Sequence, residues 1–220
     1  MKEIKAFIFD LDGVIVDTAK YHYMAWKNLA KSLGFDFTEK DNERLKGVSR
    51  EDSLNILLEI GGKNFDEKTK TKLATQKNEQ YVGLISKMTP REILPGVTNF
   101  LQSAKENGIG IVLGSASKNA PLILKQIKLA HFFDAVIDGN KVSKAKPDPE
   151  VFLNGAAAIR VHHTQCIVFE DAIAGIEAAK NANMIAVGVG DPEILKSAEI
   201  VIKGFKGLTV SELLKMVKHK

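Results

Sequence analysis

The chain has 220 residues, of which 45% are hydrophobic and 26% are charged. This is ordinary globular composition, sufficient for one substantial core and a smaller second lobe, so a disordered or repetitive chain is excluded. The net charge of +4 comes from basic residues scattered along the chain, which suits a small anionic substrate and gives no reason to expect a nucleic-acid partner.

Short apolar runs predict buried strands, and segments with helical spacing separate most of them. The runs are residues 6–9, 109–113, 135–137, 167–169, 185–189 and 200–202. Their continuous hydrophobicity is typical of parallel strands that are covered on both faces. Helical spacing occurs at residues 97–106, 121–128, 149–159 and 172–181. Strands that alternate with helices predict an α/β fold with a doubly wound parallel sheet.

Residues 19–88 interrupt this alternation, because they contain no convincing strand. Three amphipathic helices are predicted there, at 18–33, 50–60 and 65–87, with glycines 34, 61 and 62 as stops. Pro90 and Pro95 mark the return to the sheet. We therefore expect a core formed by residues 1–16 and 91–220, and a small inserted α-helical domain formed by residues 17–90.

Two carboxylates follow the first strand. Asp10 and Asp12 are two residues apart near a strand end, so their side chains point to the same side. Like charges this close need a metal ion, a shared proton or both. Gly13 then lets the backbone turn sharply. Taken alone, an acidic pair at a strand end more often caps a turn than performs chemistry.

Two further segments, one after a predicted strand and one before a predicted helix, carry candidate phosphate ligands. Small residues at 114–117 leave backbone N–H groups open to an anion, and Ser115 adds a hydroxyl, although a capped strand-to-helix turn has the same composition. Lys146 precedes two prolines that stiffen its approach, so that it could pair with a phosphate and a carboxylate together. The alternative for Lys146 is an ordinary solvated surface lysine.

The strand at 167–169 runs directly into Glu170 and Asp171. These carboxylates could ligate a metal ion or simply stabilise the start of the next helix. All four motifs follow strands, and the ligand crevice of an open α/β sheet lies outside the carboxyl ends of its strands. Together the motifs supply a nucleophilic carboxylate, an acid/base, phosphate donors, a neutralising lysine and hard oxygen ligands for Mg²⁺.

The single cysteine, Cys166, lies in an apolar run and has no partner for an intramolecular disulfide. No apolar segment approaches the roughly 20 residues that a membrane span needs. We therefore expect an unprocessed protein of the reducing cytoplasm, without a membrane partner. We also expect a monomer, because two lobes that open and close need free surface around the cleft.

Over its whole length the chain resembles the haloacid dehalogenase superfamily, whose four motifs are matched by Asp10-x-Asp12, Ser115, Lys146 and Glu170-Asp171. The resemblance implies that superfamily's Rossmann-like core, with the helical insert as a small cap that closes over the site. The agreement is closer still with the β-phosphoglucomutase family, through residues 17–22, 25–27, 45–53, 77–78 and 115–119. Members of that family convert β-D-glucose 1-phosphate to glucose 6-phosphate through β-glucose 1,6-bisphosphate.

The resemblance also implies roles in the core. Asp10 would become phosphorylated, and Asp12 would shuttle the proton to and from sugar hydroxyls. Ligands of Mg²⁺ would be Asp10, the backbone carbonyl of Asp12 and Asp171, with Glu170 nearby. The transferring phosphoryl group would be held by Ser115, the Ala116 amide and Lys146. The distal phosphate of the sugar would be held by Arg50, Ser117 and Asn119.

In the cap, the resemblance implies that His22 and Lys77 couple closure to the alignment of Asp12. The other matched positions expected at the substrate are Thr18, Trp26, Gly47, Val48, Ser49 and Lys118. Read from the residues alone, Trp26 is a core aromatic and Ser49 is a helix cap. His22 is then a lone histidine on a helix, and Lys77 is a solvated helix residue. Arg50 gains most from the functional interpretation, because a guanidinium fork suits a phosphate.

Two other functions compete with a mutase. A phosphatase of the same superfamily, acting on a hexose phosphate or another small phosphomonoester, would need the same core residues, and only the cap residues His22, Arg50 and Lys77 favour a mutase. A non-catalytic sensor of phosphorylated metabolites would usually lack Asp10 or Asp12. Both are present.

Overall fold

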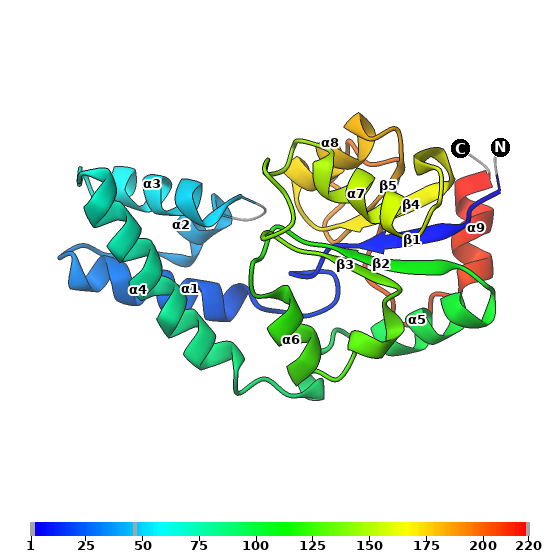
Figure 1. The fold of residues 1–220 in the computed structure, drawn as a ribbon, viewed down its shortest axis with the longest axis horizontal. Helices are drawn as coiled ribbons and strands as arrows, with labels where there is room; N and C mark the ends of the chain where they lie inside the picture. Colours follow the sequence, from blue (N-terminus) through cyan, green and yellow to red (C-terminus); the bar gives the residue numbers. More distant parts are fainter. Residues whose placement is uncertain (1–2, 46–47, 219–220) are drawn as a thin grey trace.

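In the computed structural model, which describes residues 3–45 and 48–218, a six-stranded sheet carries helices on both faces, and a group of four helices lies beyond one end of it (Figure 1). All paired strands are parallel, in the order β3-β2-β1-β4-β5-β6. The strands are β1 (Ala6–Phe9), β2 (Gly110–Gly114), β3 (Ala135–Ile137), β4 (Cys166–Glu170), β5 (Ile185–Val189) and β6 (Ile200–Ile202).

The central strand β1 sets the position of the functional edge. Phe9 is level with Leu113 of β2 on one side and with Phe169 of β4 on the other. These three strands run in the same direction, and β2 and β4 end one residue beyond the level of Phe9, so the residues that follow the strands meet at one edge of the sheet. Asp10, Ser115 and Asp171 are those residues.

Alternating side chains of the strands enter two separate cores. Phe7, Phe9 and Phe169 pack on one face, where Phe9 and Phe169 stack with ring centroids 4.6 Å apart. That face is covered by α5 (Val97–Glu106), α6 (Ala120–Gln126) and α9 (Val210–Lys218). Ala6, Ile8 and their neighbours pack on the other face, which is covered by α7 (Glu150–Ala158) and α8 (Ile173–Asn181). The sheet is therefore buried on both sides, as its uninterrupted apolar strands require.

The four remaining helices are α1 (Ala19–Ser32), α2 (Glu39–Glu43), α3 (Arg50–Ile60) and α4 (Glu67–Ile85). They enclose a hydrophobic cluster of their own, with Trp26, Leu29, Phe37 and Leu57 among its buried members. Short 3₁₀ turns occupy Pro90–Glu92, Ala130–Phe132 and His163–Gln165.

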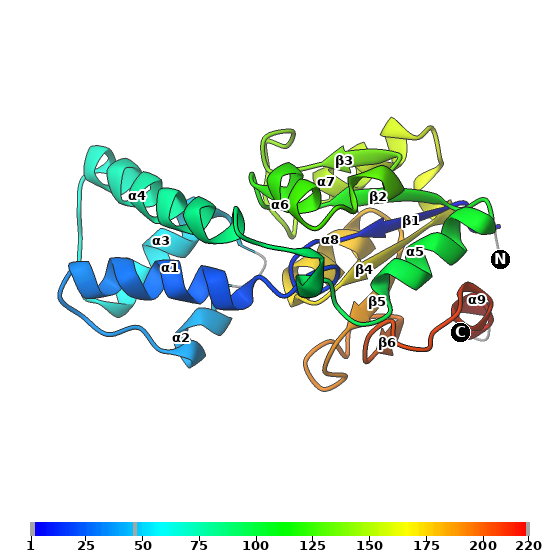
Figure 2. The ribbon, with the colours of Figure 1, turned by 90° about the horizontal axis from the view of Figure 1, so that it is seen from below.

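Two connections join these helices to the sheet, and they run side by side (Figure 2). Val16 pairs antiparallel with Ile93, and Leu94 N–H donates to the carbonyl of Ile15 at 3.0 Å. Glu92 accepts hydrogen bonds from Lys20 at 2.6 Å and from the Tyr21 hydroxyl at 2.9 Å. The entry to α1 and the exit from α4 are thus tied together.

The predicted α/β fold with a doubly wound parallel sheet is confirmed, and all six predicted strands are present. Helices α3 and α5 begin and end at the predicted residues. The helix predicted at 18–33 begins at Ala19, and Thr18 is its N-cap without a side-chain capping bond. The fourth strand is longer than the predicted 167–169, because β4 runs from Cys166 to Glu170. Glu170 was expected to follow this strand and is instead its last residue. Helices α2 and α9 were not predicted.

None of the helices within residues 3–45 and 48–218 is both long and apolar enough to cross a bilayer.

Candidate active site

A cavity of about 590 Å³ lies between the carboxyl edge of the sheet and the four helices. Most of the residues singled out from the sequence line it: Asp10, Asp12, Thr18, His22, Trp26, Val48, Ser49, Arg50, Lys77, Ala116, Ser117, Lys118, Asn119, Lys146, Glu170 and Asp171. Ser115 is fully buried behind this lining. Gly47 lies outside the described residues.

A buried lysine joins two of the strand-end carboxylates. Lys146 Nζ lies 2.5 Å from Asp10 Oδ1 and also donates to Glu170 Oε1. All three residues are almost completely buried. The interpretation of Lys146 as a solvated surface lysine is therefore wrong, and the lysine neutralises two carboxylates from its place before the cis peptide bond to Pro147.

Burial and charge act in opposite directions on this cluster. Burial raises the pKa of Glu170 to about 7, against the lowering effect of the Lys146 ammonium, and the charge of Asp10 adds to the rise. Burial alone would lower the pKa of Lys146, but the charges of Asp10 and Glu170 outweigh it and raise that pKa. Lys146 is thus held as a cation that two carboxylates share.

Three carboxylates could hold a metal ion. Asp10, Glu170 and Asp171 each offer an oxygen, and these oxygens lie within 4.8 Å of one another. Hard oxygen ligands in a group of this size fit a divalent cation such as Mg²⁺. Among the described residues, the Asp12 side chain is not part of this cluster.

Two glycines make room for these carboxylates. Gly13 has a φ of +74°, and a Cβ built there would stand 2.0 Å from Asp171 Oδ2. A Cβ on Gly175 in α8 would stand 1.9 Å from Glu170 Oε1. Both glycines are required by close approach, and Gly13 also by its left-handed backbone.

Gly175→Ala is expected to lower the free energy of unfolding by about 1–3 kcal/mol, because the added methyl group must displace the Glu170 carboxylate from Lys146. This loss opposes a gain of up to about 1 kcal/mol that alanine gives inside a helix. Denaturant titration measures the difference. The matched control is Gly83→Ala in α4, where nothing lies within 4 Å of the new Cβ, and a small gain is expected. If both substitutions stabilise the protein, Glu170 does not occupy the position described.

Asp12 stands apart from the metal cluster and is held by Thr18. The Thr18 hydroxyl donates to Asp12 Oδ1, which explains why this N-cap residue makes no capping bond. Burial and the neighbouring charge of Asp10 raise the pKa of Asp12 to about 6. A carboxyl group with a pKa of about 6 can both give and take a proton near neutral pH.

The loop after β2 is built by short-range hydrogen bonds. Ser117 N–H donates to Ser115 Oγ at 3.1 Å, and Asn119 N–H donates to Ser117 Oγ at 3.2 Å. Both hydroxyls accept in these contacts and therefore keep their own protons for another partner. The Asn119 amide in turn donates to Asn78 Oδ1 at 2.9 Å, across the cavity from the core to α4.

A cluster of basic and aromatic side chains lines the wall of the cavity that the four helices form. Lys77 Nζ lies 3.0 Å from His22 Nδ1 and 4.4 Å from the centre of the Trp26 ring. Burial, and secondarily the charge of Arg50, lowers the pKa of Lys77 to about 7. The pKa of His22 is held well below its ordinary value by burial and by Lys77. The charge of Asp12 offsets only part of the burial of Lys77, so an anion in the cavity would stabilise the Lys77 ammonium.

Lys77→Met is expected to raise the free energy of unfolding by up to about 5 kcal/mol at pH 6. The ammonium has a pKa of about 7 in the folded chain and an ordinary value of 10.5, so below pH 7 the folded state carries the whole cost of burying the charge. Between pH 7 and pH 10.5 the folded state holds a neutral amine, so the gain from the substitution should shrink as the pH rises.

Denaturant titration of Lys77→Met at pH 6 and pH 10 measures this difference. Lys72→Met serves as control, because Lys72 is exposed on the same helix and its substitution should give no pH-dependent gain. An equal gain from Lys77→Met at both pH values would show that Lys77 is not a buried cation.

The start of α3 contains a helix-capping residue and a candidate phosphate-binding residue. Ser49 is the N-cap of α3, and its hydroxyl accepts from Asp52 N–H at 3.1 Å. The structural interpretation of Ser49 as a helix cap is therefore correct. Arg50 follows in the first turn, half-buried, and burial lowers its pKa. Within residues 3–45 and 48–218, no carboxylate forms an ion pair with the Arg50 guanidinium.

Sequence reasoning did not single out Tyr81, Asn78 or Gly175 as site residues. Tyr81 is 1% exposed, and its ring centre lies 4.1 Å from that of His22 and 4.7 Å from Lys77 Nζ. Its position one turn after Lys77 on α4 was the available signal. The contact of Gly175 with Glu170 had no local signal, because it depends on how α8 returns to the end of β4.

Comparison with known proteins gives consistent results. A family model of haloacid dehalogenase-like hydrolases matches residues 4–183. A β-phosphoglucomutase of Bacillus subtilis is 45% identical over 213 residues, which cover 96% of this chain and 94% of the relative. A crystal structure of β-phosphoglucomutase from Clostridium difficile has a TM-score of 0.94 and 46% identity, with 98% of each chain covered. A phosphorylated carbohydrates phosphatase of Thermotoga maritima is 31% identical over 82% of each chain.

Proposed function

Because this chain belongs to the haloacid dehalogenase-like hydrolase family, we propose that it acts as a β-phosphoglucomutase, which interconverts β-D-glucose 1-phosphate and glucose 6-phosphate. The observation that carries this proposal is the 45% identity, over 96% of the chain, to an enzyme of that name. The cavity supports it, because anion-binding side chains line it from both sides: Lys146 from the core, Arg50 and Lys77 from the helices.

Residues 1–16 and 91–220 are the core domain in this proposal, and residues 17–90 are a cap that opens and closes. The separate hydrophobic cluster of the four helices and the paired connections at Val16 and Ile93 support this division. Closure would exclude water from the cavity between chemical steps.

Asp10 is the nucleophile. Its carboxylate attacks phosphorus of the bound sugar phosphate, the bond between phosphorus and the sugar oxygen breaks, and Asp10 carries the phosphoryl group. Lys146, Ser115 and the Ala116 amide hold the transferring oxygens. When bound at Asp10, Asp171, the Asp12 carbonyl and nearby Glu170, Mg²⁺ supplies further positive charge against the phosphoryl oxygens.

Asp12 is the acid/base. It gives a proton to the sugar oxygen that leaves, and it takes a proton from the hydroxyl that later attacks the phosphoaspartate. Its pKa of about 6 supports both roles. Thr18 holds the carboxylate, and the His22–Lys77 pair on the cap aligns it when the cap closes.

The distal phosphate is held by Arg50, Ser117 and Asn119, with Lys118 beside them. Glucose 1,6-bisphosphate has a phosphate at each end, so it fits the cavity in either orientation and can return its second phosphate to Asp10. Trp26, Val48 and Ser49 complete the wall against the sugar. A mutase needs both anion sites, whereas hydrolysis needs only one.

The test is an incubation with Mg²⁺, β-D-glucose 1-phosphate and a trace of glucose 1,6-bisphosphate, in which glucose 6-phosphate and free phosphate are followed together. We expect glucose 6-phosphate to form much faster than phosphate. A chelator should stop the reaction, and excess Mg²⁺ should restore it. Phosphate as the main product would contradict the mutase proposal.

A phosphatase is the second candidate function, because the Thermotoga maritima relative, a phosphorylated carbohydrates phosphatase, is 31% identical over 82% of the chain. The core chemistry would be the same, with water as the acceptor from phospho-Asp10. The ratio of glucose 6-phosphate to phosphate in the same incubation distinguishes the two functions.

A further inference from the structure

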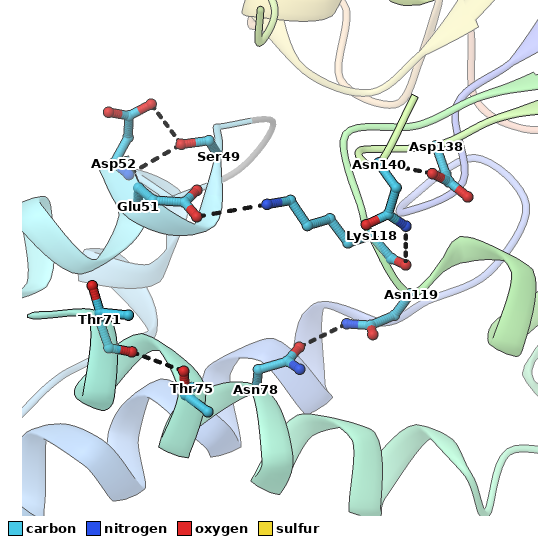
Figure 3. Close-up of polar contacts among 10 residues, drawn as sticks. All are labelled: Ser49, Glu51, Asp52, Thr71, Thr75, Asn78, Lys118, Asn119, Asp138 and Asn140. Atoms are coloured by element: carbon cyan, nitrogen blue, oxygen red, sulfur yellow. Dashed lines mark hydrogen bonds and ion pairs between the residues drawn. The ribbon is translucent and has the colours of Figure 1, made fainter. Parts of the chain in front are cut away.

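One hydrogen bond crosses the cavity between two uncharged side chains. Asn119, which caps α6 on the core, donates from Nδ2 to Oδ1 of Asn78 on α4, 41 positions away in sequence, at 2.9 Å (Figure 3). Both residues line the cavity and are partly buried. The bond therefore joins the two walls of the cavity beside the space for substrate.

This bond extends a chain of contacts that begins at the nucleophile's edge of the sheet. Ser115 Oγ accepts from Ser117 N–H, Ser117 Oγ accepts from Asn119 N–H, and Asn119 then reaches Asn78. The loop that would hold both phosphates is thus fixed at its far end by a residue of the opposite wall.

Asn78 is also adjacent in sequence to Lys77, whose side chain lies on the inner side of α4. Lys77 precedes it and points to His22 and Trp26 inside the helical group. A movement of α4 that brings Asn78 onto Asn119 therefore carries Lys77 into its place as well, because adjacent residues of one helix move together.

A second contact across the same gap is much weaker. Lys118 Nζ lies 3.7 Å from Glu51 Oε1, with side-chain exposures of 44% and 64% (Figure 3). Exposed ion pairs of this kind contribute about 0–1 kcal/mol and are screened by salt. The Asn78–Asn119 bond, which is shorter and less exposed, is the better link between the two walls.

The remaining hydrogen-bonding capacity of Asn119 explains how the link could respond to substrate. One N–H of its amide is used by Asn78, and the second N–H has no acceptor among residues 3–45 and 48–218, so it can donate to an anion. Since Asn78 fixes the plane of the amide, it fixes the direction of that second N–H. A phosphate that accepts it would be bound to a group already anchored on α4.

Resting on the mutase function proposed above, we propose that Asn78 is a positioning residue that makes closure of the cap depend on the distal phosphate. A sugar that carries a phosphate at Asn119 strengthens the link to α4 and brings Lys77 toward Asp12. A phosphoryl donor without a second phosphate does not. Asn78 thereby favours phosphorylated sugars over water as acceptors from phospho-Asp10.

The test compares two reactions of the same enzyme. The first is formation of glucose 6-phosphate from β-D-glucose 1-phosphate. The second is hydrolysis of acetyl phosphate, which donates its phosphoryl group to Asp10 with release of acetate and has no distal phosphate. Asn78→Ala is expected to lower kcat/KM of the first reaction about 3- to 10-fold, as the loss of one hydrogen bond would, and to leave the second unchanged or faster.

Gln76→Ala is the matched control, because it removes an exposed amide from the same helix and should change neither reaction. Asn78→Asp keeps an acceptor for Asn119 but adds a negative charge, so it should preserve the link and raise KM for the sugar phosphate. The double variant Asn78→Ala/Asn119→Ala should lose little more than Asn119→Ala alone, because the two residues act through one bond.

An unchanged kcat/KM for the sugar phosphate in Asn78→Ala would overturn the inference. An equal loss in both reactions would also overturn it, because it would indicate a general effect on the fold. If the wild-type protein forms no glucose 6-phosphate, the mutase proposal itself fails. The role of Asn78 is then decided by phosphate release from glucose 1,6-bisphosphate relative to acetyl phosphate in the same variants.

Discussion

Asp10→Asn is expected to lower the rate of glucose 6-phosphate formation by on the order of 10⁴-fold or more, as removal of a catalytic nucleophile does in other enzymes. The amide has nearly the size of the carboxylate and would fill the same place at the end of β1. It cannot attack phosphorus as the carboxylate does. It also replaces one of the three carboxylates that cluster with Glu170 and Asp171 by a neutral amide.

The variant must be shown to fold and to bind. Circular dichroism should be unchanged, and glucose 6-phosphate should still raise Tm, because the distal site is intact. Intact-mass measurement after exposure to acetyl phosphate should find a phosphoryl group on the wild type and none on Asp10→Asn. Asp12→Asn is the companion variant, which should still accept the phosphoryl group while losing about 10²–10⁴-fold in turnover. Substantial turnover by Asp10→Asn would place the nucleophile elsewhere.

Lys146→Met is expected to destabilise the protein by about 3–5 kcal/mol, in addition to abolishing turnover, because it leaves two buried carboxylates without their shared cation. The methionine side chain fills similar volume, so the loss reports charge and not a cavity. Denaturant titration in the absence of divalent metal measures it. Added Mg²⁺ should recover part of the stability, because it binds the same carboxylates.

Lys144→Met is the matched control, two residues earlier in the same loop. Its ammonium lies 3.3 Å from Asp148, but its side chain is 70% exposed, so a change below about 0.5 kcal/mol is expected. In the double variant Lys146→Met/Glu170→Gln, the second substitution removes one of the unpaired charges and should restore part of the stability. If Lys146→Met were as mild as Lys144→Met, the buried three-residue cluster would not exist in solution.

The sequence predicted the sheet well because buried parallel strands have a distinct local pattern. Each of the six strands is a short apolar run, and the side chains of β1 and β4 are completely buried. Two helices were missed, although each begins with a capping pattern that was visible in the sequence. Thr38 and Asp41 form a capping box at α2, and Thr209 and Glu212 bond reciprocally at the start of α9.

The site was predictable to the level of its motifs. Strand ends that meet at one edge brought Asp10, Lys146, Glu170 and Asp171 together as expected. Contacts between segments far apart in sequence were not predictable, because they depend on how helices return to the sheet. The approach of Gly175 to Glu170 and the bond between Asn78 and Asn119 are of this kind.

The central place of β1 has a consequence for synthesis of the protein. Its four residues leave the ribosome before either partner strand, since one partner begins at Gly110 and the other at Cys166. At about 5–20 residues per second, β1 waits roughly 8–30 s for its second partner. Until β4 is made, β1 keeps at least one open edge, while the helices of residues 19–85 can already pack on their own cluster. The nascent chain therefore exposes an apolar strand edge while the rest of the sheet is synthesised, and such edges are prone to aggregation.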